Sequence, residues 1–458
     1  MDARWTSFAL WGLGLLWSGL FGAFAAASWQ EGERRAVRVA LALAAGGGLL
    51  LGAGGLLPPI VRAGLLGLAG LSGAVFAALF FLPIGKVALG NDVPSRRFDE
   101  RMVMFARARL QPGTPNYEAY YRQHPEHKAG DDSTRARPGL LSPRARFANP
   151  FLFAAAAASF EVTEALHQIV DGPPAPRRET LSSEAMTAYL KSLARYYGAL
   201  DVGVTELRPY HVYSHIGRGP GEWGAPITLA HTYALAFTVE MDFAVMGAAP
   251  HAPVVAESAR QYTEAARVAV QVAAALRNLG YAARAHIDAN YRVIAPLVAR
   301  DAGLGEFGRM SILMTPRQGA RVRVGVVTTD APLIPDKRDL RFAAAVVDFC
   351  NICMKCAETC PTRSISFNPR QEVDGALRWR INPDTCFRYW NVVGTDCGRC
   401  MSVCPFSHPD TAFHNAVRWG ISRSGFFRRV ALWMDDLFYG RRPPTKAPPA
   451  WMQVDAEE

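Results

Sequence analysis

Three long stretches without a charged residue dominate the N-terminal part of the chain. They cover residues 7–29, 39–61 and 63–85. Each is long enough to cross a membrane as a helix, since a span needs about 20 apolar residues. The alternatives are buried core helices or, for the first stretch, a signal peptide cleaved near Ala25. Because three uncharged stretches in succession are hard to explain otherwise, the pattern predicts a transmembrane anchor of three helices over residues 1–88.

Basic residues lie mainly on one side of these stretches. Lys and Arg are retained on the cytoplasmic side of a membrane. The segments after the first and third stretches contain Arg34, Arg35, Arg38, Lys86, Arg96, Arg97 and Arg101. The opposite side has only Arg4 and Arg62. We therefore expect a multi-pass protein of the cell membrane whose large C-terminal part lies on the cytoplasmic face.

The remaining chain alternates between helical and strand-like patterns. Residues 89–150 are polar and rich in Pro and Arg, and they predict an extended connector. Helical periodicity marks residues 182–193, with Ser182 as the N-cap, and residues 257–279. Apolar runs with β-branched residues predict strands at 199–207, 227–241, 281–287 and 322–328. This pattern is typical of an α/β (α+β) domain, which we predict at residues 151–340.

All eight cysteines lie in two compact runs. The first run, from Cys350 to Pro361, has the C-x2-C-x2-C-x3-C-P spacing of a bacterial [4Fe–4S] site. The second run ends in C-x2-C-x3-C-P at Pro405, and its first cysteine, Cys386, lies ten residues ahead of the others. The spacing predicts a ferredoxin-like domain with two [4Fe–4S] clusters at residues 341–415. Residues 416–458 would be a C-terminal tail.

The last cysteine of each run is expected to cross to the other cluster, as it does in two-cluster ferredoxins. One cluster is then held by Cys350, Cys353, Cys356 and Cys404. The second is held by Cys386, Cys397, Cys400 and Cys360. Zinc ribbons also use paired C-x2-C hooks, but they do not require C-x3-C-P twice. Disulfides are disfavoured because cysteines three apart in a tight loop cannot all pair.

The net charge of +10 does not by itself indicate a nucleic-acid partner. The basic residues are mostly scattered arginines, which a solvated, membrane-facing surface explains. The sequence has no G-x-G-x-x-G after a strand and no phosphate-binding loop. It also lacks the Asp-x-His-x-x-Gly motif with which many cobalamin proteins bind cobalt through histidine. We expect no nucleic acid among the partners.

Part of the α/β domain resembles a known family. The motifs are AGLGEFGRM at residues 302–310, Met314-Thr-Pro, RVRV at 321–324 and VTTD at 327–330. With the short step to Phe349-Cys350, they closely resemble the corrinoid-dependent reductive dehalogenases. The epoxyqueuosine reductases share the same general layout. The resemblance implies a nitroreductase-like domain that binds a base-off corrinoid (cobalamin) next to the two [4Fe–4S] clusters.

The resemblance also implies a catalytic site built on Tyr262. The family's proton donor is a tyrosine early in the helix that precedes a Leu-Gly-Tyr turn, here Leu279 to Tyr281. A nearby cation would lower the pKa of this phenol. Arg323 matches the family's active-site arginine best, with Arg321 as its rival. Without the resemblance, Tyr262 would be a packed tyrosine with its hydroxyl at the rim, and Arg323 a solvated strand charge.

Two further parts of the site follow from the same resemblance. The family typically has an Asn-Asp pair after the strand, whereas this chain has Asp288-Ala-Asn290, so either polar residue could line the pocket. Asp288 is the candidate acid. The corrinoid would be bound by Gly303, Gly305, Gly308, Arg309 and Thr315. The glycines could equally belong to an ordinary helix cap.

The expected function is that of a membrane-anchored reductive dehalogenase. Electrons would pass through the clusters to the corrinoid, which removes halide from a small organohalide. The electron donor would be a ferredoxin, a flavodoxin or a quinol. One alternative is a corrinoid and iron–sulfur reductase of a non-halogenated substrate, similar to the epoxyqueuosine reductases. The other is a membrane-bound iron–sulfur protein that transfers electrons and has no catalytic centre.

Overall fold

The computed structural model describes residues 3–82 and 87–454. The chain divides into two compact units. Unit 1 comprises Met1–Val87 and Pro409–Pro444, and unit 2 comprises Ala88–His408 and Thr445–Glu458. The last three residues of the third predicted stretch, 83–85, and Lys86 lie outside the described residues.

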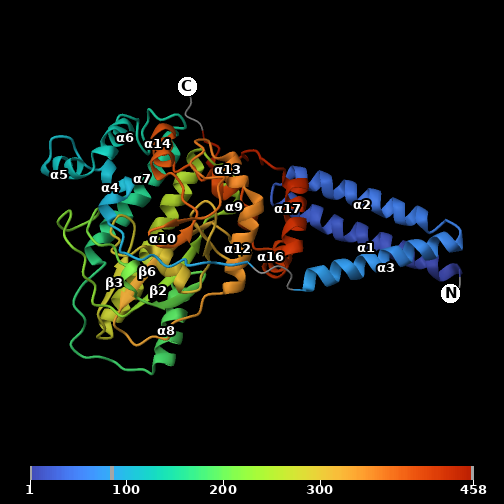
Figure 1. Cartoon of the computed structure of the whole chain (residues 1–458), viewed down its shortest axis with the longest axis horizontal. Helices are drawn as coiled ribbons and strands as arrows, with labels where there is room; N and C mark the ends of the chain where they lie inside the picture. Colours follow the sequence, from blue (N-terminus) through green and yellow to red (C-terminus); the bar gives the residue numbers. More distant parts are fainter. Residues whose placement is uncertain (1–2, 83–86, 455–458) are drawn as a thin grey trace. The chain divides into compact units, whose positions relative to one another are not determined.

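Unit 1 contains three long apolar helices, α1 (Ala3–Gln30), α2 (Arg34–Gly54) and α3 (Pro59–Phe81) (Figure 1). By length and composition all three can cross a membrane, which confirms three membrane-capable helices at the N-terminus. At 1.5 Å per residue, α2 is about 32 Å long, close to the thickness of a hydrocarbon core of about 30 Å. Most of their leucines are exposed, as expected of helices that face lipid.

Small residues let α1 and α2 pack closely. An added Cβ at Gly47 would lie 2.0 Å from the Trp17 indole nitrogen. This close approach lets side chains of α1 reach the backbone of α2. Trp17 Nε1 donates a hydrogen bond to the Leu43 carbonyl at 2.7 Å, and Ser18 Oγ donates to the Ala44 carbonyl at 2.9 Å. Small interface residues with side-chain hydrogen bonds across helices are typical of helix pairs in membranes.

Two C-terminal helices complete unit 1: α16 (Ala412–Arg423) and α17 (Gly425–Tyr439). They pack on the three apolar helices and occupy most of residues 416–458, for which the sequence predicts a C-terminal tail. The difference arises because their apolar faces pack on the ends of the three apolar helices, a tertiary contact that the local sequence does not show.

Unit 2 begins with a helical segment where the sequence predicted an extended connector. It contains η1 (Glu100–Met102), α4 (Met104–Ala108), α5 (Pro115–Gln123) and α6 (Pro125–Arg135). Arg107 is buried and lies 3.6 Å from Asp131, so the polar composition of this segment serves internal ion pairs. Helix α7 (Pro150–Ala165) and η2 (Leu166–Ile169) follow.

A four-stranded antiparallel sheet forms the centre of unit 2, in the order β1-β2-β6-β3 (Figure 1). Its strands are β1 (Val202–Glu206), β2 (Tyr233–Glu240), β3 (Ala283–His286) and β6 (Val322–Thr329). The surrounding helices are α8 (Ser183–Tyr196), η3 (Pro209–His211), α9 (Phe243–Met246), α10 (Ala252–Asn278) and α11 (Ala295–Asp301). All four predicted strands and both predicted helices are present, which confirms the mixed α/β fold.

The sheet is covered on both faces. Leu235, Phe237 and Val327 pack with residues of α8 and α10, whereas Ala236 and Val326 pack with residues of α11 on the other face. This alternation follows from the two-residue period of a strand. Residue 323 lies an even number of positions from Val327, so its side chain leaves β6 on the α10 face.

The cysteine runs follow the sheet along the chain. Their elements are α12 (Leu340–Cys353), α13 (Lys355–Thr359), α14 (Pro383–Val393), α15 (Arg399–Ser402) and η4 (Pro405–Ser407). Three short pieces of unit 2 are two-stranded or single-turn: β4 (Glu306–Phe307) with β5 (Leu313–Met314), β7 (Gln371–Val373) with β8 (Ala376–Arg378), and η5 (Ala450–Met452). Met354 and Cys397 adopt positive φ, so each run turns sharply around its thiols.

Candidate functional site

The structure brings the first predicted cysteine quartet together. Cys350, Cys353 and Cys356 surround a small cavity of about 20 Å³, and Cys404, from the second run, closes it. Burial raises the pKa of the Cys404 thiol, and its three neighbours Cys350, Cys353 and Cys356 raise it further. Four thiols around one space favour binding of a cationic metal centre, because the centre would stabilise the thiolates that removal from water disfavours.

The second quartet also converges. Burial raises the pKa of Cys400 well above its ordinary value, and Cys397, Cys386 and Cys360 are among the thiols that raise it further. Burial likewise raises the pKa of Cys386 to about 11, and the charge of Cys360 raises it further. Cys386 therefore lies beside the second group despite its offset of ten residues, because α14 returns the chain to the cluster loop.

Arg309 belongs to the surroundings of the first quartet. It is 2% exposed, and its guanidinium donates hydrogen bonds to the carbonyls of Cys350 at 3.0 Å, Ser366 at 2.8 Å and Asn368 at 2.9 Å. These bonds fix the cluster loop against the turn after β4. A direct contact between Arg309 and a corrinoid stays a prediction.

The predicted glycines and Thr315 mostly face protein. An added Cβ would lie 2.2 Å from the Met314 carbonyl at Gly305 and 2.8 Å from the Lys337 carbonyl at Gly303, where φ is also +81°. Thr315 is buried and bonded to the Gly319 carbonyl at 3.1 Å. Gly308 differs, since it lines a cavity and its Cβ would lie 3.5 Å from Cys350 Sγ.

Tyr262 and Arg323 meet on the α10 face of the sheet. The Arg323 Cζ atom lies 4.6 Å from the centre of the Tyr262 ring. Arg323 also donates to Ser258 Oγ, one helical turn before Tyr262, and lies 3.1 Å from Asp396 Oδ2. Ser258 donates in turn to the same Asp396 oxygen. The guanidinium is thus fixed between the tyrosine of α10 and the residue that precedes Cys397.

Asp288 faces the same site. It interacts electrostatically with Tyr262, Arg323, Tyr291 and Arg218, each of which responds to its charge. Asn290 is buried elsewhere and accepts a hydrogen bond from Arg284 at 2.8 Å. The charge of Asp288 thus acts on the tyrosine, whereas Asn290 pairs with Arg284.

Arg321 lies just before β6 and is occupied elsewhere. It donates to the Ser407 carbonyl at 2.6 Å and lies 3.0 Å from a Glu240 carboxylate oxygen. Of the two rival arginines, the structure therefore places Arg323 over Tyr262. The catalytic roles of Tyr262, Arg323 and Asp288 stay predictions.

The pKa of Tyr262 differs in direction from the expectation. Burial raises it above its ordinary value, and the lowering effect of Arg323 only partly opposes that rise, while Asp288 and Asp396 raise it further. Removing a phenol from water disfavours its anion more than one partly neutralised cation favours it. The phenol therefore keeps its proton at neutral pH, as a proton donor should before the reaction.

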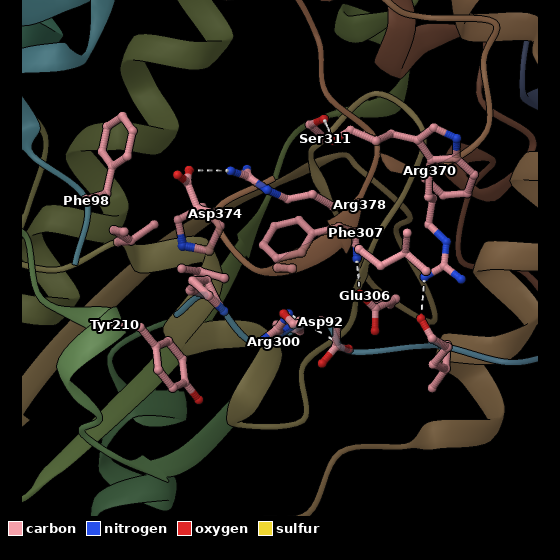
Figure 2. A pocket seen from close by; sticks show the side chains of 18 of the residues that line it. Asp92, Phe98, Tyr210, Arg300, Glu306, Phe307, Ser311, Arg370, Asp374 and Arg378 are labelled. Carbon is pink, nitrogen blue, oxygen red and sulfur yellow. Dashed lines mark hydrogen bonds and ion pairs between the residues drawn. The ribbon is translucent and has the colours of Figure 1, made fainter. Parts of the chain in front are cut away.

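A cavity of about 290 Å³ lies between the sheet domain and the cysteine runs within unit 2 (Figure 2). Its aromatic lining includes Phe98, Tyr210, Phe307 and Trp379. Its charged lining includes Asp92, Arg96, Arg300, Glu306, Arg370, Asp374 and Arg378. Gly308 connects this cavity to the Cys350 quartet.

Two buried donors at this cavity have no hydrogen-bond partner in the described part of the chain: Trp379 Nε1 and Arg300 Nη2. In the Tyr262 site, Arg323 Nε and Asp396 Oδ1 are likewise buried without a partner. Buried polar atoms are normally satisfied, so such atoms at a cavity indicate a place for a polar ligand. A group with amide and phosphate acceptors would fit the two donors at the cavity.

Sequence reasoning did not find Asp396, Ser258, Tyr291 or Arg218. Ser258 stands four residues before Tyr262, so helical spacing could have indicated it. Asp396 precedes Cys397, but only the fold brings the cluster loop to β6. Tyr291 and Arg218 come from irregular loops that carry no periodic signal.

Comparison with known proteins shows what the chain resembles in sequence and in fold. A model of the 4Fe-4S dicluster domain matches residues 349–408. A solved reductive dehalogenase, whose structure is described as suggesting a mechanism for B12-dependent dehalogenation, aligns with a TM-score of 0.63 at 25% identity. The alignment covers 78% of this chain and 48% of that chain. The chain thus contains a 4Fe-4S dicluster domain and is similar in fold to a solved reductive dehalogenase.

Sequence relatives agree with the fold. The tetrachloroethene reductive dehalogenase of Sulfurospirillum multivorans is 30% identical over 299 residues, which cover 58% of this chain and 59% of that relative. An epoxyqueuosine reductase of Listeria monocytogenes is 30% identical over 128 residues, or 26% of this chain and 31% of the relative. The chain is thus similar in sequence to the reductive dehalogenases and, over a shorter stretch, to an epoxyqueuosine reductase. It spans 59% of the length of the first and 48% of that of the solved structure.

Proposed function

We propose that this chain is a membrane-anchored, reductive dehalogenase-like oxidoreductase that removes halide from a small organohalide. The observation that supports it most is the Arg323 guanidinium held over Tyr262, with the Asp288 carboxyl facing the same site. A protonated phenol beside a fixed cation is a suitable acid for the carbon centre that loses halide.

The proposed metal centres are two [4Fe–4S] clusters. Cys350, Cys353, Cys356 and Cys404 would hold one, and Cys386, Cys397, Cys400 and Cys360 the other. The convergence of each quartet supports this assignment. Gly308 lines the cavity, and a Cβ added to it would lie 3.5 Å from Cys350 Sγ, so we propose that the first quartet delivers electrons to a cofactor in this cavity.

The proposed organic cofactor is a base-off corrinoid, and the residues present fit part of it. The cavity of about 290 Å³ is near the lower end of ligand pockets, so it would hold one edge or the nucleotide arm of so large a molecule. Trp379 Nε1 and Arg300 Nη2 would donate to its amide or phosphate oxygens. A bound corrinoid would supply the low-potential electron chemistry that breaks the carbon–halogen bond.

The overall reaction consumes two electrons and one proton. The carbon–halogen bond breaks, halide leaves with the bonding pair, and a carbon–hydrogen bond forms with the proton of the Tyr262 hydroxyl. Arg323 would stabilise the tyrosinate that remains, because its cation lies against the ring. Solvent then returns a proton to Tyr262. The two electrons come from the donor through the clusters, one at a time.

The three apolar helices would anchor the protein in the cell membrane. In the arrangement proposed here they cross it, and the first loop with its arginines lies on the cytoplasmic face, together with unit 2. The donor would be a ferredoxin, a flavodoxin or a membrane quinol.

Metal analysis and turnover test this proposal together. We expect anaerobically reconstituted full-length protein to hold about eight iron, eight sulfide and one cobalt per chain. With reduced viologen, it should release halide from at least one of a panel of halophenols, haloalkenes and haloalkanes. Clusters without stoichiometric cobalt would favour an electron-transfer protein, and zinc in place of iron would refute both functions.

A second candidate function is the reduction of a non-halogenated substrate such as an epoxide. The Asp288 carboxyl supports it, because it is a second acid at the same site as Tyr262. Asp288→Asn separates the two. If Tyr262 is the acid for dehalogenation, this variant should retain most halide release, whereas a reductase that relies on the carboxylic acid should lose about 10²–10⁴-fold in rate.

A further inference from the structure

Helices α16 and α17 pack on the end of the anchor where α1 and α3 finish and α2 begins. Ser424, between the two helices, donates a hydrogen bond to the Leu79 carbonyl near the end of α3 at 2.6 Å. Phe427 lies against Phe80, with ring centres 4.6 Å apart, and Phe438 lies against Phe24 of α1 at 4.9 Å. The two helices are therefore joined to all three apolar helices at one end of unit 1 (Figure 1).

Polar contacts fix the same arrangement. The Arg35 side chain, at the start of α2, donates to the Leu437 carbonyl at 3.2 Å. His414 of α16 lies 3.1 Å from Glu31, in the loop after α1, and both side chains are nearly buried. Gly420 allows the close approach, since a Cβ there would lie 2.5 Å from the Phe80 ring. A segment held by so many contacts is a structural part of the anchor.

The outward faces of these helices combine aromatic and basic side chains. On α17, Phe426, Arg429 and Trp433 follow each other at helical spacing, and Phe426 and Trp433 are 40% and 63% exposed. On α16, Trp419 is 38% exposed and Arg423 lies over its ring, with Cζ 4.3 Å from the ring centre. Tryptophan next to arginine is the composition found where a protein meets the boundary between lipid headgroups and acyl chains.

The depth of the contacts agrees with that boundary. Phe24 lies six residues before the end of α1 at Gln30, or about 9 Å along the helix axis. Leu79 lies two residues before the end of α3 at Phe81. Helices that lie in the membrane interface bury their apolar face by about 5–10 Å, so α16 and α17 touch the spans over the depth that this layer occupies.

We propose that α16 and α17 form a second membrane element beside the three spans. They lie in the interfacial layer of the leaflet that contains the ends of α1 and α3, and they place Trp419, Phe426 and Trp433 among the lipids. The partner is the bilayer surface itself, with its anionic headgroups opposite Arg423 and Arg429. The exposed face is continuous with the apolar surface of α3, where Phe81 is 59% exposed and packs on Trp419. The inference rests on the proposed membrane anchor, but not on the catalytic activity.

Photo-crosslinking in the full-length protein tests this placement. Trp433 and, separately, Phe426 are replaced with p-benzoylphenylalanine, and the protein is reconstituted into vesicles of phosphatidylethanolamine and phosphatidylglycerol. We expect both positions to give phospholipid adducts by mass spectrometry. Both side chains are exposed, so the replacements leave the packed face of α17 unchanged.

Two control positions make the result decisive. Leu68 of α3 is 62% exposed and should give adducts if the anchor spans the bilayer, whereas Phe438 is 4% exposed and should crosslink only to protein. Adducts at 68 but at neither 426 nor 433 would overturn the interfacial placement and leave the anchor intact. No adducts at 68 would instead refute the membrane anchor on which the inference rests.

Discussion

Arg323 Cζ lies 4.6 Å from the ring centre of Tyr262, with the side chain of Arg323 reaching from β6 to α10. The contact holds a cation against a phenol that burial keeps protonated. It also ties the phenol to the cluster domain, since Arg323 pairs with Asp396 at 3.1 Å. Asp396 directly precedes Cys397 in the sequence, so Tyr262 and the second quartet share a support.

Tyr262→Phe should separate proton delivery from cofactor binding. The change keeps the ring under Arg323 and removes only the hydroxyl, so iron and cobalt contents should stay at the wild-type level. General-acid catalysis typically contributes 10²–10⁴-fold, and we expect halide release at least about 100-fold slower. Tyr189→Phe, on an exposed part of α8, is the matched control and should have wild-type turnover. Near-wild-type activity of Tyr262→Phe would return that residue to a packing role.

The pH dependence of turnover should reflect the raised pKa of Tyr262. The reaction needs the protonated phenol, so the rate set by this group should persist through neutral pH and fall only above its ordinary value of about 10. Arg323 lowers this pKa, so Arg323→Gln should move the alkaline fall to still higher pH, whereas Arg323→Lys keeps the charge. Profiles of kcat/KM against pH measure the direction of this shift. The cluster absorbance, followed in parallel, shows whether the clusters stay intact at each pH. A shift of the fall to lower pH in Arg323→Gln would contradict the assigned contact.

Asp396→Asn should slow turnover through the position of Arg323. The variant keeps a hydrogen-bonding side chain but loses the carboxylate that faces the guanidinium at 3.1 Å. Hydrogen bonds to charged groups contribute about 1.5–3 kcal/mol, so kcat should fall roughly tenfold or more, while KM changes little.

Three comparisons give the Asp396 result its meaning. Asp396→Glu should recover part of the loss because it restores the charge. Glu372→Gln, an exposed acid on β7, should leave kcat unchanged. If Asp396→Asn loses iron in proportion to activity, its effect belongs to the Cys397 loop rather than to Arg323.

The sequence predicted the parts of this site that rest on local patterns. The strand of Arg323 and the helix of Tyr262 were both evident, because apolar periodicity shows buried elements. Local patterns did not decide between Arg323 and Arg321, because residues two positions apart on a strand point to the same face of the sheet. The contacts just before the start of β6 decide it, because Arg321 donates there to the Ser407 carbonyl. The direction of the Tyr262 pKa was wrong because the sequence shows a nearby cation but not the burial that outweighs it.

The same limit applies to the C-terminal segment. Residues such as Trp419 and Phe438 have helical spacing, but nothing local states that their partners are Phe80 and Phe24, more than 300 positions earlier. The polar segment around Arg107 was equally misleading, because its charges are paired with each other inside unit 2.

Cys386→Ala should remove one cluster and spare the other. Cys386 lies with Cys397, Cys400 and Cys360, and the other quartet contains no member of this group. We expect iron to fall from about eight to about four per chain, since each [4Fe–4S] centre needs its own thiolates. Electron paramagnetic resonance of the reduced protein should then lose the spin coupling between two centres. Loss of all iron would show that the two quartets fold as one.

A soluble form of unit 2 should be obtained only when both sequence segments of unit 1 are removed. Deleting residues 1–88 alone would expose the packed faces of α16 and α17, where Phe427 and Phe438 are each 4% exposed. Burying a side chain of this kind is worth about 1.5–3 kcal/mol, so we expect this variant to aggregate or stay in the membrane fraction.

A second variant lacks residues 1–88 and also has residues 409–444 replaced with a flexible linker. It keeps the C-terminal end, where Asn149 donates to the Val454 carbonyl at 2.7 Å. This variant should be soluble and retain both clusters by iron analysis, and equal solubility of the two variants would show that α16 and α17 do not depend on the spans.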